Sequence, residues 1–385
     1  MTNSIMEHKF ILFVNDHYNP LGMLRSLGEA GISPIVILVA LHPYLVNRSK
    51  YIGCLHTVST NEEGLSVLLS LYGNELHKPF LFTGSDGIEN LLDCHYNELK
   101  SRFYFFDGGK QGQVTHYMNK DAINQLAIEC GFVVPKEEVV DRGTLPTSLR
   151  YPVITKSIMS IVGGWKNDVF ICENDNELLQ AYEKIKSPQV LVQEYIYKKN
   201  ELCLDGFSIN GGAEVFIPFQ TTYIRFSPKS YGNYMCLQPF SDSQLMEKVQ
   251  SIIRKSGFSG IFSIEFLIDS HDNLFFLEVN FRNSTWSYAF TCGGANLPLL
   301  WAESTLAKKV DTSHLKLKRD PFTAMVEDTD FITSVIRGNV SLWRWIKEVR
   351  KCDCLFLYNK DDKKPLYSMI LNTVKMIFLR LVRIK

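Results

Sequence analysis

The residues most able to do chemistry lie in two strand-like runs, at residues 260–269 and 273–282, joined by a short polar turn. Both runs are rich in β-branched and aromatic residues and predict an antiparallel hairpin. Side chains alternate between the two faces of a strand. One face of this hairpin is therefore apolar, whereas the other carries Glu265 directly opposite Glu278.

The register of the predicted hairpin starts at its turn, where Asp269 pairs with Leu274 and Ile268 lies opposite Phe275. From the pair of Ile268 with Phe275 onward, every second cross-strand pair is apolar, and these apolar pairs share one face of the hairpin. The register also brings Asn280 onto the face that carries the two glutamates. Three oxygen-bearing side chains are therefore expected in one place.

Like charges that face each other in a sheet are destabilising unless they share a proton or bind a cation. Magnesium suits Glu265 and Glu278 because it prefers oxygen ligands, and the Asn280 amide can complete the set. Arg282 follows on the same face and can reach a phosphoryl group held by the metal. The alternative is a solvated sheet face with charges screened by water. The grouping at the end of an apolar strand favours the magnesium site.

A lysine followed by glycines precedes the hairpin. Lys156 ends a strand-like run at residues 151–155, and Gly163 and Gly164 follow it. A strand-end lysine can point at phosphates, and a glycine turn lets backbone N–H groups close over them. The spacing differs from the G-x-x-x-x-G-K-[ST] loop, so an ordinary hairpin with a glycine turn is the alternative.

A third signal is the apolar run at residues 190–196, which contains Glu194. Glu201 lies seven residues after Glu194. The strand-end lysine, the glycine loop, this segment and the two-glutamate hairpin occur in one order along the chain. In that order they resemble the ATP-grasp enzymes, and the resemblance covers residues 9–310. One departure is Ser157, where many relatives carry proline after the lysine.

The resemblance implies that two α+β subdomains grip ATP between them, and it assigns a role to each candidate residue. In the resemblance, Lys120 and Lys156 bind the phosphates, and Ser157–Trp165, with Gly163 and Gly164, forms the mobile flap. Glu194, Tyr195 and Ile196 bind adenine, and Glu201 binds the ribose. Glu265, Glu278 and Asn280 bind magnesium, and Arg282 contacts the transferred phosphoryl group.

Two weaker signals border this predicted site. Arg225 lies where relatives often place a cation near the acyl phosphate, although a surface-loop arginine is the alternative. The turn at residues 83–87 can face a substrate, but an N-cap on the following helix explains its Ser85 or Asp86 equally well.

The predicted fold class is α/β and α+β, an ATP-grasp fold behind an N-terminal Rossmann-like preATP-grasp domain. In that first domain, strand-like runs at residues 10–14, 34–39, 80–83 and 102–106 alternate with helical stretches, which favours a parallel sheet. Further along the chain, Asn119 and Gly131 predict the start and end of one helix, and the capping-box pattern at residues 241–244 with Gly257 predicts those of a helix before the hairpin. The predicted domains are the preATP-grasp domain at 1–112, the first ATP-grasp subdomains at 113–200 with the flap region at 151–196, the C-terminal ATP-grasp subdomain at 201–310, and an extension at 311–385.

Composition narrows the choice of partners. The chain has 41 Lys and Arg against 41 Asp and Glu, so it lacks the net positive charge that attracts nucleic acid. Its nine cysteines are scattered without a C-x-x-C pair, and its first residues lack a signal-peptide pattern, which together favour a cytoplasmic protein. Residues 366–385 predict a basic amphipathic helix that lies on an anionic membrane surface, or docks on the protein's own core or on a second subunit of a homodimer.

The function that these expectations favour is an ATP-dependent carboxylate–amine ligase. The resemblance implies ATP and magnesium as cofactors, with two ions expected and manganese as a substitute, and an amino acid joined to an amine acceptor in glycan or cell-envelope assembly. The D-aspartate ligases and the carbamoyl-phosphate-synthase-like members are the types it most resembles. The alternatives are a nucleotide-binding regulatory protein without turnover and a membrane-peripheral scaffold.

Overall fold

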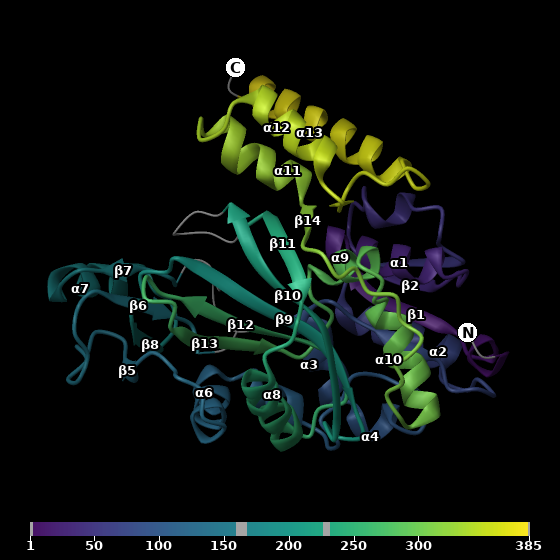
Figure 1. Ribbon diagram of the computed structural model, residues 1–385, viewed down its shortest axis with the longest axis horizontal. Coiled ribbons are helices and arrows are strands. Elements are labelled where there is room, and N and C mark those ends of the chain that lie inside the picture. The colour runs from purple at the N-terminus through teal and green to yellow at the C-terminus, as the bar shows by residue number, and fades with distance from the viewer. Residues whose placement is uncertain (1–2, 159–167, 226–231, 384–385) are drawn as a thin grey trace.

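The structure is a computed structural model, and it describes residues 3–158, 168–225 and 232–383. Three β-sheets organise these described residues (Figure 1). The N-terminal sheet and the large third sheet share one apolar core, whereas the small second sheet has a separate core.

The first sheet is parallel, with the strand order β3-β2-β1-β4. Its strand β1 is apolar from Phe10 to Val14 because helices cover both faces, α1 on one side and α2 with α3 on the other. Its elements are η1 (Asn3–Glu7), β1 (Phe10–Asn15), α1 (Tyr18–Glu29), β2 (Ile35–Val39), η2 (Val46–Arg48), β3 (Cys54–Val58), α2 (Asn61–Tyr72), β4 (Phe80–Phe82), α3 (Asp86–Cys94) and α4 (Tyr96–Leu99).

The aromatic run at residues 102–106 is not a strand, so that prediction is wrong. Tyr104 forms one isolated bridge with Phe80, and Phe105 and Phe106 fill two different apolar cores. The aromatic composition here reflects core packing rather than strand pairing. The strand β3 lies at the edge of the sheet, and its residues are mostly exposed and carry little apolar pattern.

The second sheet is antiparallel, with the order β5-β8-β6-β7. The helix before it begins and ends as predicted. The Asn119 side chain accepts hydrogen bonds from the first-turn N–H groups, and Gly131 follows the helix with φ +79°. The elements of this region are α5 (Gln113–Tyr117), α6 (Lys120–Glu129), β5 (Glu137–Asp141), β6 (Val153–Lys156), β7 (Ile171–Cys172), α7 (Asp175–Lys184) and β8 (Gln189–Glu194).

The third sheet has seven strands in the order β13-β12-β9-β10-β11-β14-β15, and its strands cross the middle of the molecule in Figure 1. The predicted helix that precedes the hairpin is capped by Asp242 and followed by Gly257 with φ +73°. The elements up to residue 307 are β9 (Asn200–Ile209), β10 (Glu214–Arg225), β11 (Tyr234–Pro239), α8 (Ser243–Ser256), β12 (Gly260–Ile268), β13 (Leu274–Asn280), α9 (Ser287–Cys292) and α10 (Leu297–Ala307).

Helix α10 joins the first and third sheets through one indole. The buried Trp301 ring lies edge-on to Phe80, Phe82 and Phe106, with ring centroids 5.8, 5.3 and 4.9 Å apart. Edge-to-face contacts of this kind add to the burial of large aromatic area. The N-terminal sheet is therefore packed firmly against the sheet that carries the hairpin.

The segment after residue 310 adds β14 and β15 to the third sheet and ends in helices at the top of Figure 1. It is anchored by the buried Arg25 of α1, which donates to the Asp362 carboxylate (3.1 Å) and to the Phe356 carbonyl (2.7 Å). Among the described residues, no helix combines the length and apolarity needed to cross a membrane. The elements are β14 (Phe322–Met325), α11 (Glu327–Asp330), η3 (Phe331–Ile336), α12 (Leu342–Lys351), β15 (Cys354–Leu355) and α13 (Lys364–Arg383).

Candidate functional site

The hairpin of β12 and β13 brings the predicted acidic residues together. Glu265 lies directly opposite Glu278, and Ser263 lies opposite Asn280, as the sequence predicts. On the other side of β12, Ser263 pairs with Asp205 of β9. The three strands at this end of the sheet therefore hold a row of polar side chains, Asn280, Ser263 and Asp205, next to the glutamate pair.

The half of the hairpin near its turn is shifted by one residue. Ile268 pairs with Leu274 rather than with the predicted Phe275, and a bulge between the two halves takes up the difference. The reason lies in β13, where Phe276 and Val279 are both buried. Two residues three positions apart cannot share a face of a regular strand, so an extra residue must be inserted between them.

The facing carboxylates are electrostatically strained. The Asn280 Nδ2 donates to an oxygen of Glu265 (3.1 Å) and to one of Glu278 (3.3 Å). Burial and the neighbouring Glu278 charge raise the pKa of Glu265 well above its usual range. Burial also raises the pKa of Asp205 to about 6. This cluster is one that a cation would stabilise.

Arg282 is held by an acid from the N-terminal unit. Its Nε and Nη2 donate to the two oxygens of Asp86, at 2.5 and 3.2 Å, and Nη2 also donates to the Asn280 Oδ1 at 3.1 Å. Asp86 is the first residue of α3. A cavity of about 30 Å³ lies here, and Lys120 and Glu278 are among the residues that line it.

The two predicted phosphate-binding lysines approach the same region. Lys120 begins α6, and its Nζ lies 3.9 Å from the Glu278 Oε2. Lys156 ends β6 and donates to the Gln193 Oε1 at 2.7 Å. Burial and the charge of Lys120 lower the pKa of Lys156 to about 7. A phosphate anion would favour the charged form of Lys156.

Gln193 is oriented by a further acid that the sequence analysis missed. Its Nε2 donates to the Glu137 Oε2 at 2.7 Å, and the Asn124 amide donates to both oxygens of Glu137 at 2.8 Å. Burial raises the pKa of Glu137. The residues come from α6, β5 and β8, so the lysine is positioned by three elements that only the tertiary fold brings together.

The residues assigned to adenine lie where the small sheet passes into the large one. Glu194 ends β8, and Tyr195 and Ile196 follow it in the connection to β9. The Glu194 N–H donates to the carbonyl of Lys136 at 2.8 Å, and the Tyr195 N–H to that of Pro152 at 3.0 Å. The segment is thus fixed through its backbone to the small sheet.

Glu201, assigned to the ribose, is buried near the start of β9. Its Oε1 accepts from the Lys198 ammonium at 2.5 Å. Its Oε2 is buried and has no hydrogen-bond partner within the described part of the chain. Burial raises the pKa of Glu201. A ribose hydroxyl is one kind of donor that would satisfy this oxygen.

Arg225, predicted to lie near the acyl phosphate, is paired in this structure with two acids of the C-terminal segment. Its guanidinium donates to both oxygens of Asp330, at 3.1 and 2.6 Å, and to Glu348 at 2.7 Å. It also stands over the Tyr234 ring, 5.2 Å from the centroid. The structure therefore ties Arg225 to the C-terminal segment, because two acids of that segment lie at the end of β10.

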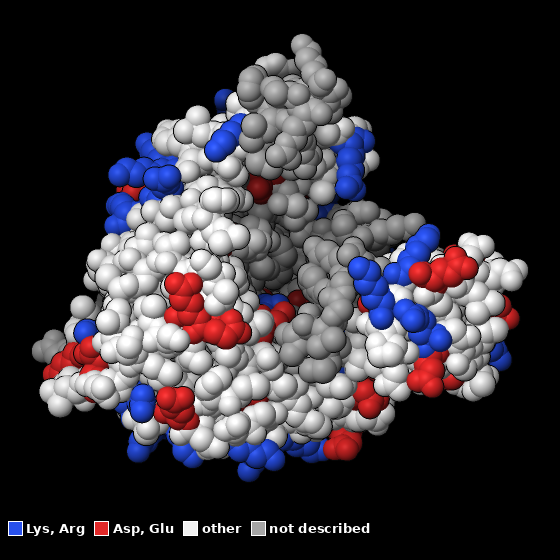
Figure 2. All heavy atoms as spheres, turned by 180° about the vertical axis from the view of Figure 1, so that it is seen from behind, with Lys and Arg blue, Asp and Glu red and all other residues white. Residues whose placement is uncertain are grey.

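The predicted flap glycines, Gly163 and Gly164, lie outside the described residues. The face in Figure 2 is hollowed between the small sheet and the rest of the molecule.

The oxygen atoms available at this site are chemically suited to bind the magnesium of a magnesium nucleotide. Glu265 and Glu278 supply carboxylate oxygens, and Asn280 supplies an amide oxygen, which are ligands that magnesium prefers. No group of three or more His, Cys, Asp and Glu side chains in the described ranges is arranged as a metal site. The protein would thus supply few ligands, and phosphate oxygens and water would complete the shell, as is common for magnesium.

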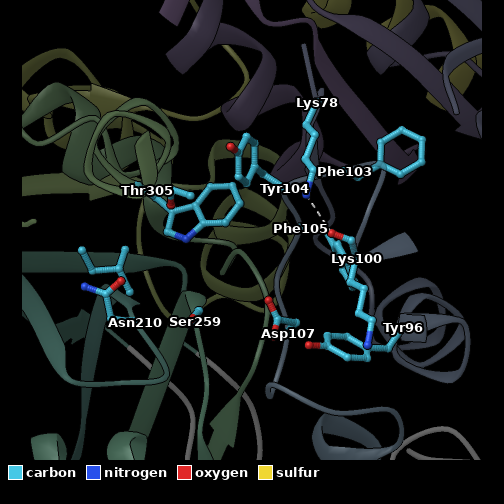
Figure 3. A pocket seen from close by; sticks show the side chains of 12 residues that line it. Lys78, Tyr96, Lys100, Phe103, Tyr104, Phe105, Asp107, Asn210, Ser259 and Thr305 are labelled. Atoms are coloured by element: carbon cyan, nitrogen blue, oxygen red, sulfur yellow. Dashed lines mark hydrogen bonds between the residues drawn. The ribbon is translucent and has the colours of Figure 1, made fainter. Parts of the chain in front are cut away.

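A cavity of about 300 Å³ lies apart from these residues, between the end of the first sheet and the third sheet (Figure 3). Lys78 points into it and donates to the Lys100 carbonyl at 3.0 Å. Asp107 lies on its opposite side, and burial raises the pKa of this carboxyl to about 6. The residues that line it are other than the predicted site residues.

Solved structures reveal which fold this is. The L-amino acid ligase from Bacillus licheniformis superposes with a TM-score of 0.62 at 13% sequence identity, over 82% of this chain and 78% of that chain. The N5-carboxyaminoimidazole synthetase from Staphylococcus aureus gives a TM-score of 0.65 at 15% identity, over 85% of each chain. The chain has the ATP-grasp fold. Other structures similar to this ATP-grasp chain were determined with ADP or with MgADP.

Sequence comparison agrees with the ATP-grasp assignment, but the matched region is a smaller part of this chain than the structural comparisons cover. The chain is 28% identical over 177 residues to the carbamoyl phosphate synthase arginine-specific large chain of Bacillus subtilis (strain 168), which is 43% of this chain and 17% of that protein. The ATP-grasp chain therefore spans only a small part of that relative's length. No family model matches the sequence.

Proposed function

We propose that this ATP-grasp protein is an ATP-dependent ligase that activates a carboxylate as an acyl phosphate for attack by an amine. The observation that carries the proposal is the convergence of Glu278, Arg282 and Lys120 around one small cavity, with Glu265 directly opposite Glu278 on the neighbouring strand. Two facing carboxylates suit a divalent cation, and the two cationic side chains suit phosphate. Such an arrangement serves phosphoryl transfer, in which positioning and charge neutralisation supply most of the catalysis.

In the proposed reaction, a carboxylate oxygen of the substrate attacks the γ-phosphorus of ATP, and the bond to the bridging oxygen breaks to release ADP. The amine then attacks the acyl carbon, inorganic phosphate leaves, and the amine loses a proton. Lys120 and Lys156 hold phosphate oxygens, and Arg282 neutralises charge on the transferred group. Magnesium, held by Glu265, Glu278 and Asn280, supplies further charge neutralisation when bound.

We propose an amino acid as the carboxylate and a small amine or an amine of a glycan or peptide as the acceptor. The likeness to an L-amino acid ligase supports this choice, although that likeness concerns the fold. Two magnesium ions, with manganese as a substitute, belong to the same proposal. The nine cysteines are all free thiols, which supports a reducing, cytoplasmic compartment.

The test is ADP release from Mg·ATP in the presence of pooled D- and L-amino acids and amine acceptors. Glu278→Gln should reduce turnover at least about a hundredfold, because a charged metal ligand is lost, while nucleotide affinity changes less. Glu129→Gln, an exposed change on α6, is the matched control.

Stimulated ADP release by the wild type and the control, but not by Glu278→Gln, would support the ligase. Equal turnover in Glu278→Gln and the wild type would refute the metal assignment. Nucleotide binding without turnover for any member of the pool would favour the regulatory alternative.

A further inference from the structure

Over residues 364–375, helix α13 is apolar on two sides, and only one of them is covered by the described part of the chain. Leu366 and Met369 pack against the main core. Tyr367, Leu371 and Val374 recur every three to four residues on another side, and they are 58%, 70% and 60% exposed. An apolar stripe of this kind has a large free-energy cost in water unless something covers it.

Helix α12 presents a second exposed stripe. None of its residues is buried, and the Trp343 side chain is 76% exposed. Lys347 and Arg350 follow Trp343 at spacings of four and three, so the three side chains share one side of the helix. The other side faces the protein, where the Trp345 indole donates to Asp330 at 2.9 Å.

The C-terminal segment is also strongly basic. From residue 331 to 385 the chain has 12 Lys and Arg but four Asp and Glu, whereas the whole chain has equal numbers of each. Three of those four acids pair with cations from elsewhere in the chain: Glu348 with Arg225, Asp353 with Lys318, and Asp362 with Arg25.

These helices form the upper end of the molecule in Figure 1, and basic side chains outnumber acidic ones around that end in Figure 2. The exposed apolar stripes therefore lie among side chains whose net charge is positive.

We propose that α12 and α13 dock on an anionic lipid surface, with the apolar stripes entering the interface and the basic residues contacting lipid headgroups. Charge complementarity selects this occupant, because an excess of Lys and Arg beside exposed tryptophan and leucine matches anionic headgroups above acyl chains. The helix α13 has 20 residues and lies along such a surface rather than through it.

The test is sedimentation of the full chain with vesicles of phosphatidylcholine, with and without phosphatidylglycerol. Binding should require phosphatidylglycerol and weaken with salt. Lys347→Gln combined with Arg350→Gln should lower the partition coefficient about 25-fold, because each cation near the surface contributes about fivefold. The control is Lys248→Gln combined with Lys255→Gln, which removes the same charge from α8.

The apolar contribution is tested in the same way. Leu371→Ser should lower partitioning about tenfold, whereas Leu76→Ser, at a position 93% exposed in the N-terminal unit, should leave it unchanged. Thermal unfolding of each variant verifies that it is folded.

Wild-type protein that fails to bind phosphatidylglycerol vesicles, or C-terminal variants that bind as well as their controls, would overturn the proposal. A dimer that Leu371→Ser dissociates, without vesicle binding, would also overturn it and assign the face to a second copy. Nucleotide affinity measured on the same samples separates this failure from a failure of the proposed ligase function.

Discussion

Replacement of Lys156 by glutamine should remove a pH dependence from nucleotide affinity. Burial and the charge of Lys120 lower the pKa of Lys156 to about 7. A bound phosphate favours the charged ammonium, so nucleotide binding above this pKa requires the side chain to take up a proton. Glutamine retains hydrogen-bonding capacity but has no charge to gain.

The magnitude follows from the titration of Lys156. With a pKa of about 7, roughly nine tenths of the ammonium is charged at about pH 6 and roughly one tenth at about pH 8. The affinity of the wild type relative to Lys156→Gln should therefore fall about tenfold over this interval. The ratio cancels the titration of the nucleotide itself, because both proteins bind the same ligand.

The assay is calorimetric titration with Mg·ADP at the two pH values, with Lys184→Gln on α7 as the control. Proton uptake should appear as a dependence of the wild-type enthalpy on the ionisation enthalpy of the buffer. A ratio of affinities that is the same at both pH values would refute the depressed pKa or its role in phosphate binding.

The lowered pKa of Lys156 also predicts a stability effect. Between the folded pKa of about 7 and the ordinary value of 10.5, the unfolded chain binds more protons than the folded protein. The contribution of Lys156 to the free energy of unfolding therefore rises with pH in this window.

Two further substitutions test the contacts between the N-terminal unit and the third sheet. Asp86→Asn should lower turnover about tenfold or more while Mg·ADP affinity changes little, because it loosens the Arg282 guanidinium without touching the lysines; steady-state kinetics that match the wild type would contradict this. Trp301→Ala should lower the free energy of unfolding by about 3–5 kcal/mol in urea denaturation, because it empties the space beside Phe106. Trp343→Ala on the exposed side of α12 is the control, and equal losses from both substitutions would contradict the packing argument.

Local patterns in the sequence were sufficient to predict several features of this protein. Strand alternation placed Glu265 opposite Glu278, and the cap residue Asn119 marked the start of α6. Each of these depends on neighbours in sequence or on a single hairpin, where spacing alone determines which side chains share a face.

Other features were decided by contacts between distant segments. The strand-like run at residues 102–106 is used for core packing, and the hairpin bulge arises because the core requires both Phe276 and Val279. Composition alone could predict neither the packing role of residues 102–106 nor the bulge, because the space that a side chain fills is determined by elements elsewhere in the chain.

The same holds for the cations of the candidate site. Strand alternation placed Arg282 on the glutamate face, but only the structure shows that Asp86 holds it there and that Asp330 pairs with Arg225 in the C-terminal segment. Their partners lie 196 and 105 residues away along the chain. An arginine's position depends on which carboxylate the fold brings within reach, and only the tertiary structure decides that.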